Sequence, residues 1–585
     1  MAFTLGISCF FHDSAACLID DDKIICAAEE ERFTRIKHDN SFPINAINFC
    51  LEKANIKSEN LGTVVFYENP VTKFDRVFKT LVKNFPKSIS IIKDVATDWH
   101  SNKLWFKEIC NQKLNIDKNK IKFFNHHESH LYSALIPSGF KNAACLTIDG
   151  VGEWITTEGS IFKNNNIEKS FSVKFPHSIG ILYSALTEFL GFEVNDGEYK
   201  VMGLAAYGEP KYVDKIEKLF LYRNKNDFKL NLNFFSFEYS NKTNLTKNFI
   251  DLFGKPREPE SKFLLSEQLS PMQFKLDNYQ KYYADVASSL QFVVRDQILL
   301  FVKHLRQISD SENLIYAGGV AYNSVINEEI LKSSGFKKVF IQPAAGDNGG
   351  ALGAALGFNW KLRVNKSNYT LENVYLGKSY SEKDCLNELE NYSFKIKKFK
   401  NKDEQAKYLA ELIFQNKIIG FFRSGFEFGP RALGNRSIIA DPRKIQMKNK
   451  INKSVKYREQ FRPFAPVVLD KKVDEYFDIN KTQSLRQPYK FMLSVAKTKK
   501  NMIDNLQAVT HVDGTARVQI LYENDNPLLY KVIEEFGNIS GVYCLINTSF
   551  NIRGEPMVAS PKDALKTFTY SDLDILSLEN YIIAK

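Results

Sequence analysis

The stretch Asn125-His126-His127-Glu128-Ser129-His130 follows an apolar run, Ile121 to Phe124, that is typical of a short strand. If the stretch forms a helix, His126 and His130 lie four residues apart on one face and can direct two imidazoles at one ion. His127 then faces elsewhere. Because two ligands hold a metal weakly, this spacing predicts a metal site that other parts of the chain must complete.

Carboxylates at two predicted strand ends are the candidates for completing this site. Ala143 to Ile148 has the apolar pattern of a buried strand and ends in Asp149-Gly150-Val151-Gly152, while Asp347 opens a Gly-rich helix after Pro343. Glycines let the backbone approach a ligand, although Asp-Gly is also the commonest hairpin turn. Two nitrogens and two oxygens would form a donor set suited to Fe(II), Zn or Mn.

The first thirty residues predict three short strands, Thr4 to Ser8, Ala15 to Ile19 and Ile24 to Ala28. The loop between the first two contains His12-Asp13-Ser14, its only side chains capable of proton transfer or ligation. His12 is therefore a candidate for catalysis, and simple solvation of a loop histidine is the alternative.

Two glycine-containing stretches are candidates for binding a nucleotide. Asn195 to Leu204 interleaves polar, charged and glycine residues too tightly for a packed helix face, and it includes Gly197 and Lys200. Further on, a predicted strand is followed by Gly318-Gly319 and by Asn323 at a helix start. Such a turn places backbone amides against phosphate, although a tight strand-to-helix turn without a ligand has the same sequence.

The pattern of residue types changes beyond about residue 360. Lys361 to Leu371 is polar and predicts a linker, and a second αβ unit begins at Val374. Its basic side chains are embedded among Gly, Pro and Phe, which favours guanidinium groups fixed for binding anions. The alternative is buried ion pairing with Glu427, Glu459 and Asp513. The stretches concerned are Glu427 to Ser437, Lys456 to Pro463, His511 to Arg517 and Asn547 to Asn551.

Composition is that of a globular protein of two or three domains, with 585 residues, 44% hydrophobic and 25% charged. The net charge of +11 allows anionic partners, but no dense basic run is present and we expect no nucleic-acid partner. Eight scattered cysteines without a Cys-x-x-Cys pair indicate reduced thiols. Without a basic N-terminal region or a long uncharged apolar run, we expect a soluble cytoplasmic protein with no membrane partner.

Over nearly its whole length the chain resembles the bacterial O-carbamoyltransferases of the nodulation and antibiotic-biosynthesis type, which include the tobramycin and cephalosporin carbamoyltransferases. The most specific motifs are Glu427 to Ser437 and Phe461 to Pro466; His12 to Ala15, His126-x-x-x-His130, Gly197 to Leu204 and Gly318 to Ala321 also match. The resemblance implies an α/β fold with two domains. Residues 1–362 would form a duplicated actin/sugar-kinase-type domain, akin to the tRNA threonylcarbamoyladenosine transferases, with two βββαβα halves. Residues 372–585 would form an α+β domain of the YrdC-like type.

The resemblance also implies a two-step, ATP-dependent carbamoyltransferase reaction. The C-terminal domain would convert carbamoyl phosphate and ATP, with Mg²⁺, into carbamoyl adenylate. The N-terminal domain would pass the carbamoyl group to an acceptor hydroxyl, on a sugar or another natural product, with an Fe(II)-like ion on His126, His130, Asp149 and Asp347. The implied catalytic residues are His12, as general base, and Arg431, Lys456 and Arg517. Implied nucleotide and phosphate contacts are Gly197, Lys200, Gly318, Gly319, Asn323, Arg458, Arg462, Asn547, Asn551 and Arg553.

Two other functions are compatible with the sequence. One is a tRNA threonylcarbamoyladenosine-type enzyme, which would use bicarbonate and threonine; the other is a catalytically inactive nucleotide-binding scaffold. The acceptor, the metal and the oligomeric state stay open, with a homodimer as the expectation. Acceptor specificity is expected in the variable segments 69–110 and 211–275.

Overall fold

The chain folds into two compact units. In this computed structural model, the described residues are 3–21, 23–89, 91–92, 103–259, 261, 270–274, 276–363, 369–459, 461–480 and 482–585. Unit 1 comprises Met1–Glu30, Asp39–Ser261 and Asn278–Leu371; unit 2 comprises Glu31–His38, Lys262–Asp277 and Glu372–Lys585. Residues 364–368 of the predicted linker lie outside the described residues, and Lys361 and Leu362 belong to a helix, so the linker prediction was wrong for these two.

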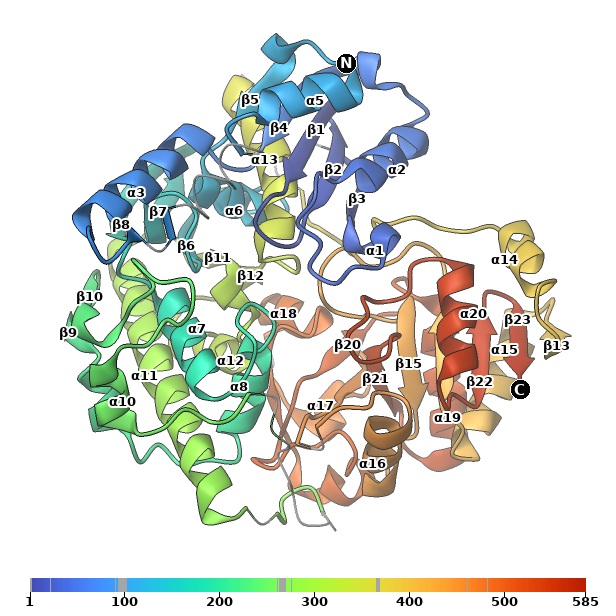
Figure 1. Ribbon diagram of the computed structural model, residues 1–585. Helices are drawn as coiled ribbons and strands as arrows, with labels where there is room; N and C mark the ends of the chain where they lie inside the picture. Colours follow the sequence, from blue (N-terminus) through green and yellow to red (C-terminus); the bar gives the residue numbers. More distant parts are fainter. Residues whose placement is uncertain are drawn as a thin grey trace. The chain divides into compact units, whose positions relative to one another are not determined.

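Unit 1 contains two five-stranded sheets of the same topology (Figure 1). In each, three strands form an antiparallel meander and two more add in parallel beside the first of them, as expected for duplicated βββαβα halves. The first sheet has the order β3 (Lys23–Glu29), β2 (Ala15–Asp20), β1 (Phe3–Ser8), β4 (Leu61–Phe66) and β5 (Ile121–Phe123). The second has the order β12 (Lys338–Ile341), β11 (Asn313–Ala317), β6 (Ala143–Ile148), β7 (Ile155–Lys163) and β8 (Asn166–Lys174). The three predicted N-terminal strands are confirmed within a residue or two.

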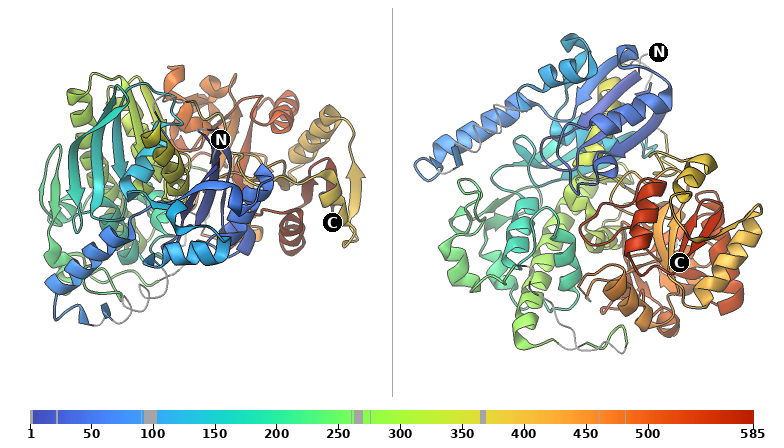
Figure 2. Two further views of the ribbon diagram at one scale, coloured as in Figure 1. Left: turned by 90° about the horizontal axis from the view of Figure 1, so that it is seen from above. Right: turned by 45° about the vertical axis from the view of Figure 1, so that its right-hand side comes forward.

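Helix α13 (Asp347–Leu362) packs against the first sheet and against α6 (His126–Leu135) (Figure 2). Small residues make this approach possible. A Cβ atom on Gly353 would lie 1.7 Å from the carbonyl oxygen of Ser129 in α6, so no larger residue fits there without moving the helices apart. This packing brings the N-terminus of α13 beside the histidines of α6.

The remaining elements of unit 1 surround the two sheets. A small hairpin and two short helices occupy much of the segment 211–275, which was expected to be variable and to determine acceptor specificity. The hairpin is β9 (Phe220–Arg223) and β10 (Phe228–Leu230). The helices are α2 (Ile44–Ala54), α3 (Pro70–Lys83), α5 (Phe106–Leu114), α7 (Ile179–Phe189), α8 (Glu198–Ala205), α9 (Val213–Glu217), α10 (Lys247–Phe253), α11 (Asn278–Ile308) and α12 (Ser324–Ser333).

Unit 2 is built on a mixed eight-stranded sheet with helices packed beside it. Its strand order is β13 (Lys395–Lys398), β23 (Tyr581–Ala584), β22 (Ile575–Leu578), β14 (Ile419–Phe422), β15 (Arg436–Ala440), β21 (Cys544–Ser549), β16 (Ala465–Leu469) and β20 (Gln519–Leu521). A smaller sheet has β17 (Phe477–Asp478), β18 (Ala496–Thr498) and β19 (Thr515–Ala516). The helices are α14 (Glu382–Leu389), α15 (Lys402–Phe414), α16 (Ile445–Ser454), α17 (Val473–Tyr476), α18 (Gln487–Lys490), α19 (Pro527–Ser540) and α20 (Pro561–Tyr570).

One piece of unit 2 comes from the N-terminal part of the chain. Helix α1 (Glu31–Thr34) carries the buried Arg32, whose guanidinium donates a 2.8 Å hydrogen bond to the carbonyl of Gly429. Arg35 donates to the carbonyls of Pro556, at 2.8 Å, and Met557, at 2.5 Å. Segment Glu31–His38 is therefore an integral part of unit 2, which the predicted division into residues 1–362 and 372–585 did not anticipate.

Two further expectations concern side-chain chemistry and membrane spans. All eight cysteines are buried and free, in agreement with the predicted reduced thiols. Among the helices of the described residues, none combines the length and the apolar character that crossing a bilayer requires.

Candidate functional site

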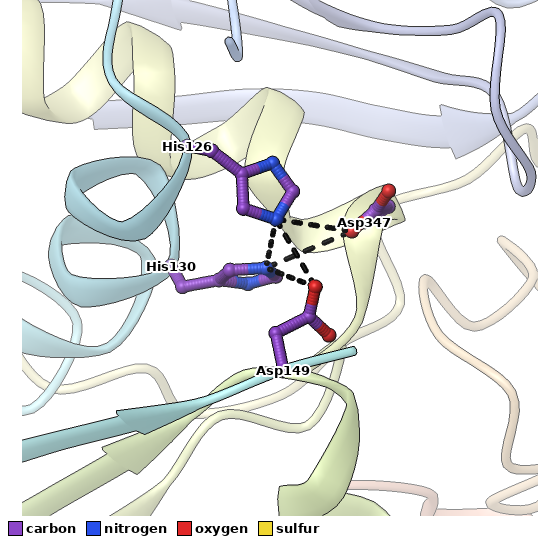
Figure 3. A group of neighbouring side chains, drawn as sticks. All are labelled: His126, His130, Asp149 and Asp347. Atoms are coloured by element: carbon purple, nitrogen blue, oxygen red, sulfur yellow. Dashed lines mark hydrogen bonds and ion pairs between the residues drawn. The ribbon is translucent and has the colours of Figure 1, made fainter. Parts of the chain in front are cut away.

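The structure brings together the four residues predicted to bind a metal (Figure 3). The predicted helix forms as α6, so His126 and His130 lie on one face with their Nε2 atoms 3.2 Å apart. Asp149 follows β6, and its Oδ2 lies 3.1 Å from Nε2 of His126. Asp347 begins α13, and its Oδ1 lies 3.6 Å from Nε2 of His130 and 3.8 Å from that of His126. All four residues are buried.

These donor atoms fit a divalent cation. All lie within 4.8 Å of one another, and the closest pairs are 3.1 to 3.8 Å apart. Ligand bonds of about 2.1 Å in a tetrahedral arrangement separate donor atoms by roughly 3.4 Å, so little adjustment would be needed. Two imidazoles and two carboxylates suit Fe(II), Zn or Mn, as the sequence predicted.

Two glycines place the ligands of this cluster. A Cβ atom on Gly152 would lie 2.1 Å from the imidazole of His126, so this position must lack a side chain for the ring to fit. The backbone N–H of Gly319 donates a 3.0 Å hydrogen bond to Oδ1 of Asp149, leaving Oδ2 toward the histidines. Gly319, predicted to line a nucleotide, here orients a carboxylate of the cluster.

Opposite charges stabilise one another in this cluster. Burial opposes ionisation of Asp149, but its interactions with His126 and His130 outweigh burial and hold the pKa of this carboxyl well below its usual range. Burial likewise opposes protonation of His126, yet the charges of Asp347 and Asp149 raise its pKa. The carboxylates of the cluster therefore favour the protonated form of His126.

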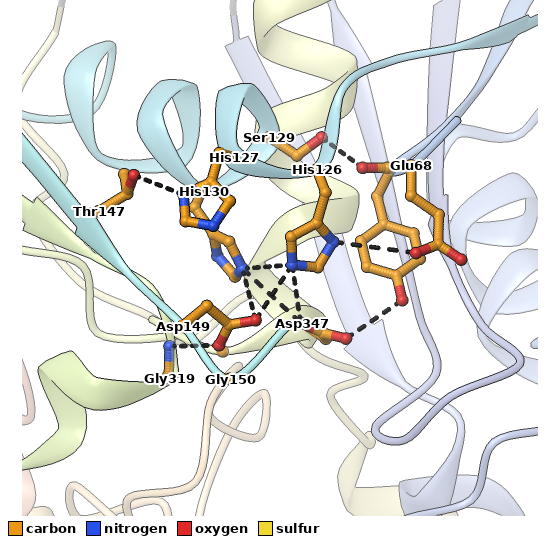
Figure 4. A network of polar contacts seen from close by, with 12 residues as sticks. Glu68, His126, His127, Ser129, His130, Thr147, Asp149, Gly150, Gly319 and Asp347 are labelled. Atoms are coloured by element: carbon orange, nitrogen blue, oxygen red, sulfur yellow. Dashed lines mark hydrogen bonds and ion pairs between the residues drawn. The ribbon is translucent and has the colours of Figure 1, made fainter. Parts of the chain in front are cut away.

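Sequence reasoning missed the residues behind these ligands (Figure 4). The Tyr67 hydroxyl donates a 3.1 Å hydrogen bond to Oδ2 of Asp347. The carboxylate of Glu68 lies 4.0 Å from Nδ1 of His126 and forms a buried 2.6 Å ion pair with Lys73. Both residues directly follow strand β4, so Glu68 shows the same signal, a carboxylate at a strand end, that revealed Asp149.

His12 is placed in electrostatic range of this cluster. Its Nδ1 lies 3.0 Å from Oδ2 of Asp13. Burial lowers the pKa of His12, but the hydrogen bond with Asp13 and the charges of Asp347, Asp13 and Asp149 raise it to about 9. The histidine is thus protonated at neutral pH while those carboxylates carry no cation, which suits donation to an anionic group rather than acceptance of a proton.

The other predicted nucleotide contacts of unit 1 have varied roles. Asn323 caps α12 by accepting from the N–H of Ile326, and its amide forms a reciprocal pair of 3.0 Å hydrogen bonds with Gln291. Gly197 is the N-cap of α8, and Lys200 within that helix is buried. Gly318 adopts φ = +94°, a conformation that favours glycine, and its turn leads from β11 to Gly319. The side-chain amide of Asn323 is thus held by hydrogen bonds within unit 1.

In unit 2 the predicted basic residues form a cluster of like charges. Burial lowers the pKa of Arg517 well below its usual range, and the charges of Arg431, Arg458 and Arg462 act in the same direction. Its buried Nε lacks a hydrogen-bond partner among the described residues. Three guanidinium groups within electrostatic reach of Arg517 create a positive region that an anion would neutralise.

Lysines join this cluster in two different ways. Lys456 is buried and directs its ammonium at the carbonyl and hydroxyl of Ser549 and at Asn551, with 2.7 Å to Oδ1 of the latter. It therefore holds the chain after β21. Lys448 in α16, which the sequence did not single out, is also buried; burial and the charge of Arg458 lower its pKa to about 8.

The acidic residues considered as ion-pair partners act differently from one another. Oε1 of Glu427 accepts from the backbone N–H groups of Leu433, Asn435 and Arg436, so it shapes the loop that carries Arg431. Glu459 lies 3.5 Å from Arg462, the ion pair that the alternative interpretation anticipated. Among the predicted contacts, Asn547 donates to Ala432 and Gln519 inside the sheet, and Arg553 lies exposed beyond β21.

Two family models match this chain, and similar proteins align with nearly all of it. A family model described as carbamoyltransferase N-terminus matches residues 4–356, and one described as carbamoyltransferase C-terminus matches residues 410–585. An uncharacterized protein, sll1178, of Synechocystis sp. is 38% identical over all of this chain and 97% of its own length. Nodulation protein NolNO of Sinorhizobium fredii is 35% identical, covering 98% of this chain and 79% of its own.

Solved structures with some likeness share little sequence with this chain. Component A of the (R)-2-hydroxyglutaryl-CoA dehydratase from Acidaminococcus fermentans is 12% identical, with a TM-score of 0.30 over 62% of this chain and 99% of its own. A ROK family glucokinase from Streptomyces griseus is also 12% identical, with a TM-score of 0.25 over 60% of this chain and 98% of its own.

Proposed function

The chain belongs to the carbamoyltransferase family, and from this premise we propose that it forms carbamoyl adenylate in unit 2 and transfers the carbamoyl group to an acceptor hydroxyl in unit 1. One observation supports the division most strongly. Unit 1 carries a cluster of imidazoles and carboxylates suited to a cation, and unit 2 carries a cluster of guanidinium groups suited to phosphate. The acceptor would be a hydroxylated sugar or natural product.

In unit 2, carbamoyl phosphate would first be cleaved to carbamate and phosphate, with water supplying the oxygen. A carbamate oxygen then attacks the α-phosphorus of Mg²⁺-bound ATP, and pyrophosphate leaves. Arg431, Arg458 and Arg517 would bind the phosphoryl oxygens, because planar guanidinium groups donate two parallel hydrogen bonds to such anions. The YrdC-like character of this unit is part of the same proposal.

In unit 1, the acceptor hydroxyl attacks the carbamoyl carbon, its proton passes to a base, and AMP leaves with the electron pair of the broken bond. A divalent cation such as Fe(II) on the four ligands would stabilise negative charge at the reacting oxygen. The family resemblance makes His12 the base. A cation would neutralise Asp149 and Asp347, whose charges raise the pKa of His12, and would so favour its neutral form.

Pyrophosphate release tests the proposal directly. Purified chain with ATP, Mg²⁺ and carbamoyl phosphate, but no acceptor, should release pyrophosphate and phosphate together. Mass spectrometry of reactions with a panel of hydroxylated sugars should then show a carbamoyl increment on one of them. Absence of pyrophosphate release under all acceptor conditions would contradict the proposal.

The tRNA threonylcarbamoyladenosine alternative has its own substrate signature. The same assay with bicarbonate and threonine in place of carbamoyl phosphate should give no pyrophosphate. Release with that pair, and none with carbamoyl phosphate, would assign the chain to the alternative reaction.

A further inference from the structure

Helix α3 is attached to unit 1 by its polar side. Lys73 is buried and pairs with Glu68 at 2.6 Å, and the buried guanidinium of Arg76 lies 4.7 Å from the ring centroid of Phe175. At the C-terminal end, Lys83 pairs with Glu238 at 3.3 Å. A surface helix of a globular protein ordinarily buries its apolar side and exposes its charges, so α3 has the reverse orientation.

The apolar side of this segment faces outward. Within α3, Val71, Phe74, Phe78 and Val82 recur every three or four positions and share one side of the helix. Phe85 and Ile89 follow beyond the end of the helix and are exposed as well. Phe74 and Phe78 stack with ring centroids 6.0 Å apart, so their exposed rings adjoin. We call the following residues the outward apolar face, with their exposed fractions: Val71 65%, Phe74 39%, Phe78 56%, Val82 60%, Phe85 66% and Ile89 56%.

A second exposed group lies by the start of α3. The ring of Phe11 has Nζ of Lys73 at 5.0 Å and Nζ of Lys103 at 5.5 Å from its centroid. The two residues after Lys103, Leu104 and Trp105, are exposed, as is Phe11 itself. Exposed apolar residues in such number are typical of a binding surface.

The charges around this face decide what it binds. Because Lys73 and Arg76 are buried on the inward side, the exposed basic residues of this segment are Lys79, Lys83 and Lys87, against one acidic residue, Asp75. The whole chain carries +11. The side chains of Lys79 and Lys83 are each 63% exposed. In a symmetric contact with a second copy, this positive segment would face itself and repel. An apolar stripe beside lysines is instead complementary to anionic lipid headgroups above acyl chains.

We propose that unit 1 binds the surface of a membrane containing anionic lipid through the outward apolar face, with the aromatic and aliphatic side chains inserted and the lysines at the headgroups. The sequence predicted no membrane partner, because that expectation rested on the absence of a long apolar run. The present proposal needs no spanning segment.

Vesicle flotation tests this proposal on the full-length chain. Wild-type protein should float with phosphatidylcholine vesicles that contain phosphatidylglycerol, more weakly at high salt, and far less with phosphatidylcholine alone. Phe78→Asp should weaken binding tenfold or more, because a charge would enter the acyl region. Leu221→Asp in β9, at a position 64% exposed, is the matched control and should bind like wild type.

Several results would overturn the proposal. These are failure of the wild type to bind, equal binding by Phe78→Asp, and a wild-type dimer in light scattering that Phe78→Asp dissociates, which would assign the face to a second copy. Circular dichroism checks that the variant is folded, and Phe85→Ser provides a second, uncharged test with the same expected loss. Vesicle binding requires neither ATP nor carbamoyl phosphate, so its outcome is independent of the proposed reaction.

Discussion

The two clusters of ionisable side chains differ in how their charges are balanced. In unit 1, His126 and Asp149 shift each other's pKa toward the charged forms, so opposite charges offset each other. In unit 2, burial and the like charges of Arg431, Arg458 and Arg462 lower the pKa of Arg517, and a bound anion would offset this repulsion. A site for a cation can thus be stable in the free protein, whereas a site for a polyanion stores repulsion that binding relieves.

The largest effects are expected from one variant in each cluster, assayed for both steps of the proposed reaction. Arg517→Ala should reduce acceptor-independent pyrophosphate release by a hundredfold to a thousandfold, because a charge-assisted donor to the developing phosphoryl charge is lost. His130→Ala should leave that release unchanged and abolish carbamoyl transfer. Coupled assays of pyrophosphate and of carbamoylated product measure both steps.

Arg486→Met and His304→Ala are the controls for these variants, since Arg486 pairs with the exposed Asp474 and His304 belongs to helix α11. Both control variants should retain pyrophosphate release and carbamoyl transfer. Arg517→Ala should also lower carbamoyl transfer, because transfer consumes the adenylate. Equal loss of pyrophosphate release and carbamoyl transfer in His130→Ala would show that a single site performs both steps.

The pH dependence of the free energy of unfolding should reveal the cost of burying Lys448 beside Arg458 in unit 2. Lys448 has a folded-state pKa of about 8 against 10.5 in the unfolded chain, so between these values the unfolded state binds the extra proton. The free energy of unfolding should therefore rise as pH increases from 8 to 10.5, by about 3 kcal/mol at most from this group. Urea denaturation at several pH values measures the change.

Lys448→Met should be more stable than wild type at pH 7 and should lose this dependence. Lys450→Met, on the exposed side of the same helix, is the matched control and should keep it. Inorganic phosphate should flatten the wild-type profile, because an anion favours the protonated lysine. An unchanged slope in Lys448→Met would contradict the assignment.

The smallest effect is expected behind the ligands of unit 1. Glu68→Gln should weaken metal binding about tenfold, since the carboxylate beside Nδ1 of His126 favours the tautomer that leaves Nε2 free to bind an ion. Competition titration with Co(II), followed by its absorption spectrum, measures affinity without any assay of activity. Glu238→Gln, which also removes a lysine partner, is the control. Unaltered affinity in Glu68→Gln would leave that carboxylate with no part in the site.

The sequence allowed the metal cluster to be predicted better than its surroundings, for a physical reason. His126 and His130 are tied by helical periodicity, and Asp149 and Asp347 by their places at strand ends, so local pattern was sufficient. The hydrogen bonds between Asn323 and Gln291 could not be predicted, because Gln291 lies on a helix distant in sequence that no local pattern connects to Asn323.

The fold shows the same division between local and long-range information. The three N-terminal strands and the duplicated sheets followed from alternation and from the family resemblance. The exposure of Phe78 and the burial of Arg76 in α3 did not, because amphipathic periodicity defines two sides of a helix without showing which one packs inward.

The segment Glu31–His38 limits where the coding sequence could be divided into two separate polypeptides. Arg32 and Arg35 complete unit 2 from the N-terminal end of the chain, by hydrogen bonds to carbonyls near residues 429 and 556. A gene fission at the 371/372 boundary would therefore separate unit 2 from an arginine that fills its interior. Successful division into two polypeptides would require a circular permutation or a transplanted α1, so this architecture favours inheritance of both units as one reading frame.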